Sequence, residues 1–392
     1  MVDFLPPLAD AADYPPPCVP PLPYLGYRDL WFRGRGGRAH AAGRHQEVTI
    51  SGRAAIGRIA EVLALGRHSR VLVPAYHCPS VVEPLLACGA NVEFYPLEKD
   101  LRPSLREFEE LLGPPTDLVV FIRYFGFAPD TTAALTSARR AGASVLHDCA
   151  HAYYALTSIP SNDFAIASLV KFFPFEEGGL ACYPESVVLR RRPLEACPSG
   201  RDVRLLWHAL ERTHRSQRGR LFPLSTLVAL LNAVRDAYRP SSRMVTGEGN
   251  VTRDAAFRYY DVGCVDEQPA LLTRILLMNL DRARVAARRR ENYRRIADWF
   301  SNRRDVRALF PELPDGVVPY VFPLVLGSPG WQFDALRRRG VPLYRWEELA
   351  PSSCTVSAEY RASLVQLPCH QDLTERDLQR LSEAVSVALG MY

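Results

Sequence analysis

Lysine is almost absent from this chain. Of 48 basic residues only Lys99 and Lys171 are lysines, and all the others are arginines. A position that needs only positive charge is served by arginine, so a rare lysine suggests chemistry that a guanidinium cannot perform. An amine can form a Schiff base with an aldehyde and can lose its proton near neutral pH, whereas a guanidinium stays charged. Lys171 in "SLVKFF" is therefore a candidate catalytic residue, and Lys99 in "PLEKD" is expected to be a surface charge.

Other features that the sequence lacks exclude several classes of protein. Its nine cysteines form no Cys-x-x-Cys pair and have no histidine at zinc-ligand spacing, which predicts reduced thiols and no metal site. The longest apolar run, residues 222–234, is broken by polar side chains and is too short to span a bilayer. The start "MVDFLPPLAD" does not have the basic and then apolar order of a signal peptide. We expect a cytoplasmic protein with no membrane partner.

The composition is that of an ordinary globular protein. The chain has 392 residues, 47% of them hydrophobic and 23% charged, which is enough for two domains with sizeable cores. The formal net charge of +5 is mild for this length, so no nucleic-acid partner is expected. The arginine-rich stretch 281–295 is interpreted as a solvated helix face.

The chain divides into three parts. Residues 1–47 form a proline-rich arm, because residues 1–24 contain eight of the 32 prolines and cannot form regular helix or central strand. Residues 48–250 form a large α/β domain with an insertion around 195–250, in which 239–250 is predicted to be a loop by its Pro, Ser and Gly content. Residues 251–392 contain one long amphipathic helix, predicted over 269–300, and a small α+β domain.

Short apolar runs alternate with helical stretches in the large domain. Strands are predicted at 70–76, 91–97, 117–125, 143–150, 163–170 and 178–184, and helices at 54–65, 80–89, 104–113 and 131–142. This alternation predicts a three-layer α/β/α fold with a mostly parallel sheet. In the smaller domain, a strand is predicted at 320–326 and helices at 332–341 and 374–389.

Candidate site residues follow the predicted strands, where parallel sheets bind ligands. Asp148 ends one strand, and a carboxylate there can hold the protonated ring nitrogen of a pyridine cofactor. His151 follows it, and Ser168 lies three residues before Lys171. Gly52 and Arg53 precede a helix whose free N–H groups can hold a phosphate. Each signal also has an ordinary interpretation, such as a helix cap or a surface lysine.

Five motifs in order resemble a known family. They are "SGRAAI", "VLVPAYHCPSVVEPLLACGANVEFYPL", "HDCAHA", "SLVKFFPFEEGG" and "LPCHQDLTERDL". Together they resemble the DegT/DnrJ/EryC1/StrS family of pyridoxal-phosphate enzymes, which have the aspartate-aminotransferase fold, fold type I. The resemblance implies pyridoxal 5'-phosphate as the cofactor, bound covalently by Lys171 and paired at its ring nitrogen with Asp148. It also implies that His151 contacts the ring or its phenolic oxygen, and that Gly52, Arg53 and Ser168 form the phosphate site.

The sequence departs from the family at four places. Ser168 precedes Lys171 by three positions, where sugar-aminotransferase members more often have five. Arg53 stands where members commonly have threonine. Cys78 stands at the position of the aromatic side chain that stacks on the cofactor, and Tyr76 lies two residues earlier, so both are candidates to cover the ring. The family's Asn-Tyr-Arg segment, which reaches the partner subunit, has no match near 259–272.

The resemblance implies an aminotransferase that works as a homodimer. The amino donor would be glutamate or glutamine, and the acceptor a nucleotide-linked keto-sugar or a natural-product intermediate. Two alternatives remain: a pyridoxal-phosphate lyase or dehydratase on the same scaffold, and a catalytically silent protein of this fold. The dehydratase branch replaces the lysine with histidine, which Lys171 argues against.

Overall fold

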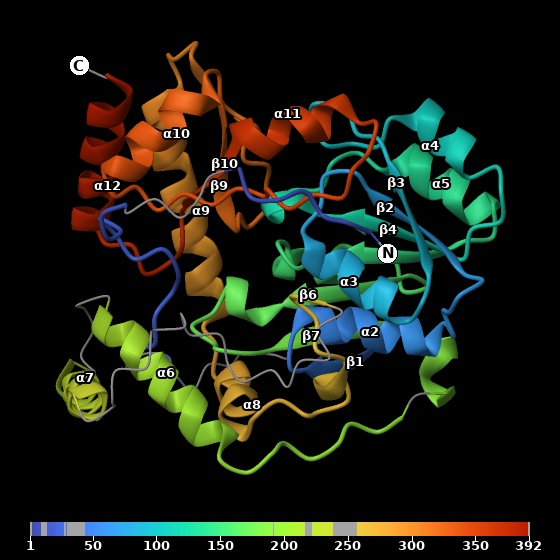
Figure 1. Cartoon of the computed structure of the whole chain (residues 1–392), viewed down its shortest axis with the longest axis horizontal. Coiled ribbons are helices and arrows are strands. Elements are labelled where there is room, and N and C mark those ends of the chain that lie inside the picture. The colour runs from blue at the N-terminus through green and yellow to red at the C-terminus, as the bar shows by residue number, and fades with distance from the viewer. Residues whose placement is uncertain are drawn as a thin grey trace.

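The computed structural model describes residues 2–8, 14–26, 29, 44–190, 192–215, 222–237 and 257–390. The predicted loop 239–250 lies outside these residues. Figure 1 shows a large sheet with helices against it and a smaller domain at the upper left. The division of the chain at residues 47/48 and 250/251 stays a prediction.

A seven-stranded sheet forms the large domain, in the order β1-β7-β6-β5-β4-β2-β3. Its strands are β1 (Arg44–Thr49), β2 (Arg70–Pro74), β3 (Asn91–Tyr95), β4 (Leu118–Ile122), β5 (Ser144–Asp148), β6 (Phe164–Ser168) and β7 (Gly179–Pro184). Strand β7 is antiparallel to both of its neighbours, and β6, β5, β4, β2 and β3 pair in parallel. The mostly parallel sheet predicted from the sequence is confirmed. Strand β1 was missed because "RHQEVT" is polar, and it spans the predicted start of the domain.

Helices cover this sheet on both faces. They include α2 (Gly52–Val62), α3 (Pro79–Ala87), α4 (Leu105–Leu111) and α5 (Thr132–Arg140). The chain moves outward from β2 to β3 and then back through β4, β5 and β6, so right-handed crossovers place α3 on one face and α4 and α5 on the other. Figure 1 shows α2 and α3 in front of the sheet. The central strands β4 and β6 are buried along their whole length, as a covered parallel sheet requires.

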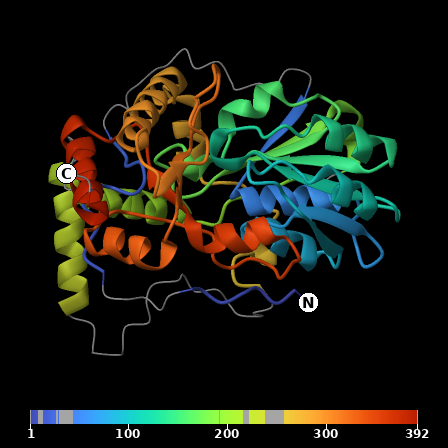
Figure 2. The same cartoon turned by 90° about the horizontal axis from the view of Figure 1, so that it is seen from above.

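The C-terminal part forms the predicted smaller α+β domain, which lies beside the large sheet in Figure 2. Its antiparallel sheet has the order β10-β9-β8. Its elements are α9 (Arg282–Phe300), β8 (Val306–Ala308), β9 (Val321–Leu326), α10 (Pro329–Arg338), α11 (Thr355–Ser363), β10 (Leu364–Pro368) and α12 (Glu375–Leu389). A reciprocal capping box between Thr374 and Asp377 starts α12, because each residue satisfies a backbone N–H of the other.

In the chain, three further helices lie between the large sheet and the smaller domain: α6 (Arg201–Arg215), α7 (Phe222–Ala237) and α8 (Leu271–Met278). Short 3-10 turns follow four of the strands, namely η1 (Tyr124–Gly126), η2 (Tyr153–Ser158), η3 (Leu169–Lys171) and η4 (Glu185–Arg190), and a fifth, η5 (Val262–Cys264), precedes α8. The turn η3 carries the candidate lysine directly behind β6.

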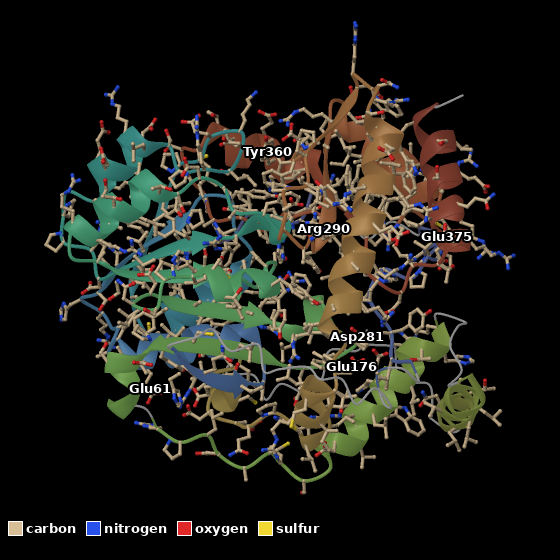
Figure 3. All side chains as sticks on the ribbon, turned by 180° about the vertical axis from the view of Figure 1, so that it is seen from behind. Glu61, Glu176, Asp281, Arg290, Tyr360 and Glu375 are labelled. Carbon is tan, nitrogen blue, oxygen red and sulfur yellow. The ribbon has the colours of Figure 1, made fainter. Side chains whose placement is uncertain are left out.

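The single helix predicted over 269–300 is wrong. The chain forms α8, breaks at Asn279, and starts again with α9. Asp281 causes the restart, because its side chain accepts a hydrogen bond from the backbone N–H of Arg284 at 2.9 Å. Figure 3 shows Asp281 at the beginning of α9 and Arg290 farther along the same helix.

The described parts of the N-terminal arm, residues 2–8 and 14–26, contain no helix or strand and lie along the smaller domain. The backbone N–H of Leu5 donates to the carbonyl of Leu349, and that of Cys18 to the carbonyl of Gly340. The Nε2 atom of His370 lies 2.9 Å from the carbonyl oxygen of Pro20. The arm is therefore hydrogen-bonded to the smaller domain at these three points.

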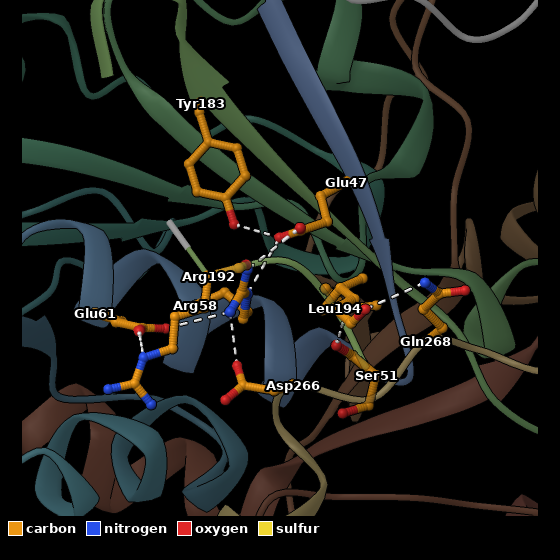
Figure 4. A network of polar contacts seen from close by, with 10 residues as sticks. Glu47, Ser51, Arg58, Glu61, Tyr183, Arg192, Leu194, Asp266 and Gln268 are labelled. Carbon is orange, nitrogen blue, oxygen red and sulfur yellow. Dashed lines mark hydrogen bonds and ion pairs between the residues drawn. The ribbon is translucent and has the colours of Figure 1, made fainter. Parts of the chain in front are cut away.

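A buried arginine joins β1, α2 and the chain that leads into α8. Arg58 has no exposed side-chain surface and forms ion pairs with Glu47, Glu61 and Asp266, at 3.2, 3.2 and 2.6 Å. Figure 4 shows these carboxylates around the guanidinium. A buried cation is tolerated when its donors are paired in this way. The network therefore holds the segment after residue 257 against α2, at one side of the site described below.

In the part of the chain that the structure describes, no helix combines the length and apolar character needed to span a membrane.

Candidate active site

The carboxyl ends of the parallel strands open into a cavity of about 690 Å³. Seven of the eight site residues named from the sequence line it: Gly52, Arg53, Cys78, Asp148, His151, Ser168 and Lys171. Asp148 is the last residue of β5, Ser168 is the last residue of β6, and Gly52 begins α2. The sheet topology thus brings together residues as far apart in the chain as Gly52 and Lys171, which are separated by 119 positions.

Lys171 is a half-buried amine within this cavity. Burial lowers its pKa below the usual value for lysine, while the neighbouring Cys78 and Asp148 act in the opposite direction. Its Nζ atom lies 5.7 Å from the centre of the Tyr320 ring. A lowered pKa makes the neutral, nucleophilic form of the amine more accessible near neutral pH.

Asp148 is a buried carboxyl group, 3% exposed, beside that amine. Its Oδ1 atom accepts a hydrogen bond from the backbone N–H of Ala150 at 2.8 Å. Burial raises its pKa above the usual range, and the Ala150 N–H and the charge of Lys171 lower it. A cationic partner would therefore stabilise the carboxylate form of Asp148.

His151 is 4% exposed and is held between aromatic rings. Its ring centre lies 4.6 Å from that of Tyr320 and 5.2 Å from that of Trp346. Burial keeps its pKa well below the usual value, so the imidazole is neutral. Its Nδ1 atom has no hydrogen-bond partner among the described residues. Buried polar atoms are nearly always paired, so this nitrogen is available to a bound ligand.

The start of α2 forms another part of the cavity wall, next to the end of β6: a Cβ atom on Gly52 would lie 3.6 Å from the Cβ atom of Ser168. Ser51 caps the helix by accepting a hydrogen bond from the N–H of Ala54 at 3.1 Å. A Cβ atom on Gly179 would lie 2.3 Å from the carbonyl carbon of Ser51, so β7 can approach this turn only as glycine. Arg53 donates a hydrogen bond to the carbonyl of Tyr259, a residue that also lines the cavity. The N-terminus of α2 and Arg53 make this part of the cavity suitable for an anion.

Tyr76 is not among the described residues that line the cavity, so its contact with the cofactor ring stays a prediction. The ring is fully buried and packs 5.0 Å from Trp346 and 6.1 Å from Tyr360, between centres. It points this way because Ala75 and Tyr76 follow β2 inside the core between the two domains. Cys78 does line the cavity, and so does Trp346.

Sequence reasoning missed the contribution of the smaller domain and of the segment 257–261. Trp346, Phe257, Tyr259 and Tyr260 all line the cavity. Glu83 on α3 holds this segment, because its carboxylate accepts hydrogen bonds from the N–H groups of Arg258 and Tyr259 at 3.1 and 2.7 Å. These residues come from irregular chain with no periodic pattern, so no local signal marked them.

The solvated face predicted for residues 281–295 is wrong for Arg289. Its side chain is 0% exposed, on the buried face of α9. The sequence held a signal for this, because Arg289 has helical spacing with the apolar residues Val285, Tyr293 and Ile296.

A model of the DegT/DnrJ/EryC1/StrS aminotransferase family matches residues 38–174. The resemblance seen in the sequence is confirmed over that region. This match contains all the residues from Gly52 to Lys171 that line the cavity. No curated protein sequence matches the chain.

Solved structures of aminotransferases share the fold. PseC of Helicobacter pylori, an aminotransferase involved in the biosynthesis of pseudoaminic acid, is 14% identical with a TM-score of 0.64, over 95% of this chain and 99% of that one. The aminotransferase TlmJ from Streptoalloteichus hindustanus is 18% identical with a TM-score of 0.59, over 100% and 99%. NtdA from Bacillus subtilis, solved with the bound cofactor PMP, is 14% identical with a TM-score of 0.60, over 89% and 74%. The family match and this fold support a pyridoxal-phosphate-dependent aminotransferase.

The cavity fits the cofactor that the family implies. A primary amine, a buried carboxyl group and an imidazole nitrogen with no partner among the described residues line it, together with a helix N-terminus that β7 approaches closely at Gly179. These are the groups that an aldehyde, a pyridine nitrogen, a phenolic oxygen and a phosphate require. The volume of about 690 Å³ leaves room for a substrate as well.

Proposed function

We propose that this protein transfers an amino group from glutamate or glutamine to a carbonyl substrate, which is a nucleotide-linked keto-sugar or a related natural-product intermediate. The observation that carries the proposal is the meeting of Lys171, Asp148 and His151 in one cavity, where the Nδ1 atom of His151 has no partner among the described residues. Lysine with aspartate in this arrangement suits amino-group transfer on pyridoxal phosphate.

Pyridoxal phosphate, when bound, would supply an aldehyde and an electron-accepting ring. Lys171 would hold the aldehyde covalently, and its neutral amine is the group that would accept and return a proton. Asp148 would pair with the ring nitrogen. His151 would position the ring through Nδ1, while Gly52, Arg53 and Ser168 would hold the phosphate. Cys78 and Trp346 are the candidates to cover the ring, since both line the cavity.

An anionic acceptor is supported by the charges at the cavity wall. Arg53 and Arg204 line it without an ion pair among the described residues, whereas Arg201 and Arg258, which also line it, pair with Glu267 and Glu348. Arginine is well suited to phosphate groups because its planar N–H donors match their geometry. A nucleotide-linked substrate carries such groups.

Glutamate added to the purified, cofactor-loaded protein tests the proposal. We expect the visible absorbance of the lysine-bound cofactor to disappear as the amino group moves to the cofactor, and 2-oxoglutarate to appear in equal amount. A lyase or dehydratase would release ammonia or water from its own substrate without forming this keto acid. An unchanged spectrum with both glutamate and glutamine would contradict the amino donor that we propose.

We also propose a homodimer. The helix α8 exposes Leu271, Ile275 and Met278, at 53, 42 and 64% of their surface. These residues have the spacing of one helical stripe, and such a patch favours contact with a second copy. The stripe lies on the chain between the segment 257–261 and α9, close in sequence to the cavity wall.

Light scattering across a range of concentrations tests the dimer. We expect twice the chain mass at micromolar protein, and we expect Ile275→Glu to shift the protein toward monomer because it places a charge in the apolar stripe. Arg294→Gln, an exposed change on α9, is the matched control and should leave the mass unchanged. Wild-type protein that stays monomeric at tens of micromolar (roughly the range in which weak dimers form) would refute the proposal.

A further inference from the structure

The buried Arg289 guanidinium uses all of its N–H donors inside the protein. An arginine side chain has five such donors. Five hydrogen bonds lead from it to neutral acceptors: Nε to Oε1 of Gln371 at 2.9 Å, Nη1 to the carbonyls of Pro319 and Tyr320 at 3.3 and 2.7 Å, and Nη2 to the carbonyls of Lys171 and Phe172 at 3.1 and 3.2 Å. The guanidinium also lies over the Phe172 ring, 4.7 Å from its centre.

These acceptors come from both the large and the smaller domain. Lys171 and Phe172 belong to the turn behind β6 in the large domain. Tyr320 directly precedes β9 in the smaller domain, and its ring faces both Nζ of Lys171 and the imidazole of His151. Gln371 completes the arrangement, because its Nε2 atom donates to the carbonyl of Phe172 at 3.0 Å. One side chain on α9 therefore holds the backbone of the lysine and the backbone of the ring that faces it.

Burial of the Arg289 guanidinium costs free energy, because it removes a charge from water. Burial lowers the pKa of Arg289, which shows that the environment disfavours the charge. No other side chain offers the same planar set of donors, since lysine has three donors at a single point. Loss of the guanidinium would leave four backbone carbonyls around the site without these donors, and unpaired buried carbonyls favour rearrangement of the chain.

We propose that Arg289 is a positioning residue for Lys171: it fixes the backbone of the lysine-bearing turn against Tyr320 and so sets where the amine lies in the cavity. The role of Lys171 in catalysis rests on the proposed function, but its placement by Arg289 does not. Arg289 itself does not line the cavity and acts through the backbone of its neighbours.

Competitive labelling tests this placement, because the chain has only two lysines. The full chain without cofactor is treated with a trace of acetic anhydride over a pH series, and peptide mapping gives the labelling of Lys171 relative to Lys99. Lys99 is an internal reference, with a 71% exposed side chain. The pH midpoint of the ratio reports the environment of the Lys171 amine, whereas its amplitude reports access of the reagent. In wild-type protein we expect the Lys171 midpoint to lie below the usual pKa of a lysine, because burial lowers it.

In Arg289→Met, we expect the Lys171 midpoint to move upward toward the usual pKa of a lysine, because the released turn lets water reach the amine. With cofactor and substrates we expect kcat to fall about 10- to 100-fold with a smaller change in KM, as misplacement of a reacting group predicts. Arg294→Gln, on an exposed turn of the same helix, should match wild type in both measurements.

A cooperative thermal transition establishes that each variant is folded. If Arg289→Met does not fold, Arg289→Lys carries the test, because it keeps the charge but cannot reach carbonyls on both sides, and its midpoint should move in the same direction. A folded Arg289→Met or Arg289→Lys protein with the wild-type midpoint would overturn the proposal. Labelling requires neither cofactor nor substrate, so a shifted midpoint in a protein without aminotransferase activity would refute the proposed function and leave the positioning role in place.

Discussion

Lys171→Arg is expected to abolish turnover while leaving the protein folded. The substitution keeps a positive charge in the cavity but replaces the amine with a guanidinium, which neither forms a stable bond with an aldehyde nor releases its proton near neutral pH. Both functions that we assign to this side chain, covalent binding of the cofactor and proton transfer, are lost together. We expect amino-group transfer to fall below detection in a coupled assay for the keto acid.

Borohydride reduction locates the covalent bond in the wild-type protein. Reduction of the loaded enzyme should fix the cofactor on the peptide that contains Lys171, and no label should appear on Lys99. The matched control is Lys99→Arg, which removes an exposed amine whose only ion pair is with Glu359 at 3.8 Å among the described residues. That variant should keep full activity. A label on Lys99, or turnover retained by Lys171→Arg, would remove Lys171 from the mechanism.

The part of the site that the sequence predicted has a common physical origin. Asp148 and Ser168 end strands, and Lys171 directly follows one. Because parallel strands present their carboxyl ends at the same edge, residues at these positions meet however far apart they lie in the chain. An apolar run that ends in a single acid or lysine can be recognised in the sequence alone. The large sheet was predicted from the same apolar runs.

The part that was missed depends on contacts between domains. Trp346 and Tyr320 reach the site from irregular chain or from the residue before a strand, where no periodicity predicts the direction of a side chain. Arg289 was assigned to solvent because it stands in a run of arginines, and such runs usually form a solvated helix face. Its burial follows from the five acceptors gathered by three separate segments, and single-sequence patterns do not report such convergence. The break before α9 was missed for a simpler reason, since Asp281 caps a helix inside a run that is amphipathic throughout.

Asp148→Asn is expected to reduce turnover by about 1,000-fold while leaving the protein folded and able to bind pyridoxal phosphate, because loss of one preorganised charge in a desolvated site has an effect of this order. An amide cannot stabilise a protonated ring nitrogen as a carboxylate does, so the ring withdraws electrons less strongly when the proton leaves the donor carbon. Binding should persist, since Lys171 and the residues proposed to bind the phosphate are unchanged.

Asp163→Asn is the matched control. Asp163 is equally buried, but it lies before β6, where it pairs with Arg139 and His147 at 2.6 and 2.9 Å. That change should lower the thermal stability and leave the turnover of the folded enzyme near wild type. Stopped-flow absorbance with glutamate separates cofactor binding from proton removal in both variants. A rate for Asp148→Asn close to that of the wild type would show that this carboxylate does not hold the ring nitrogen.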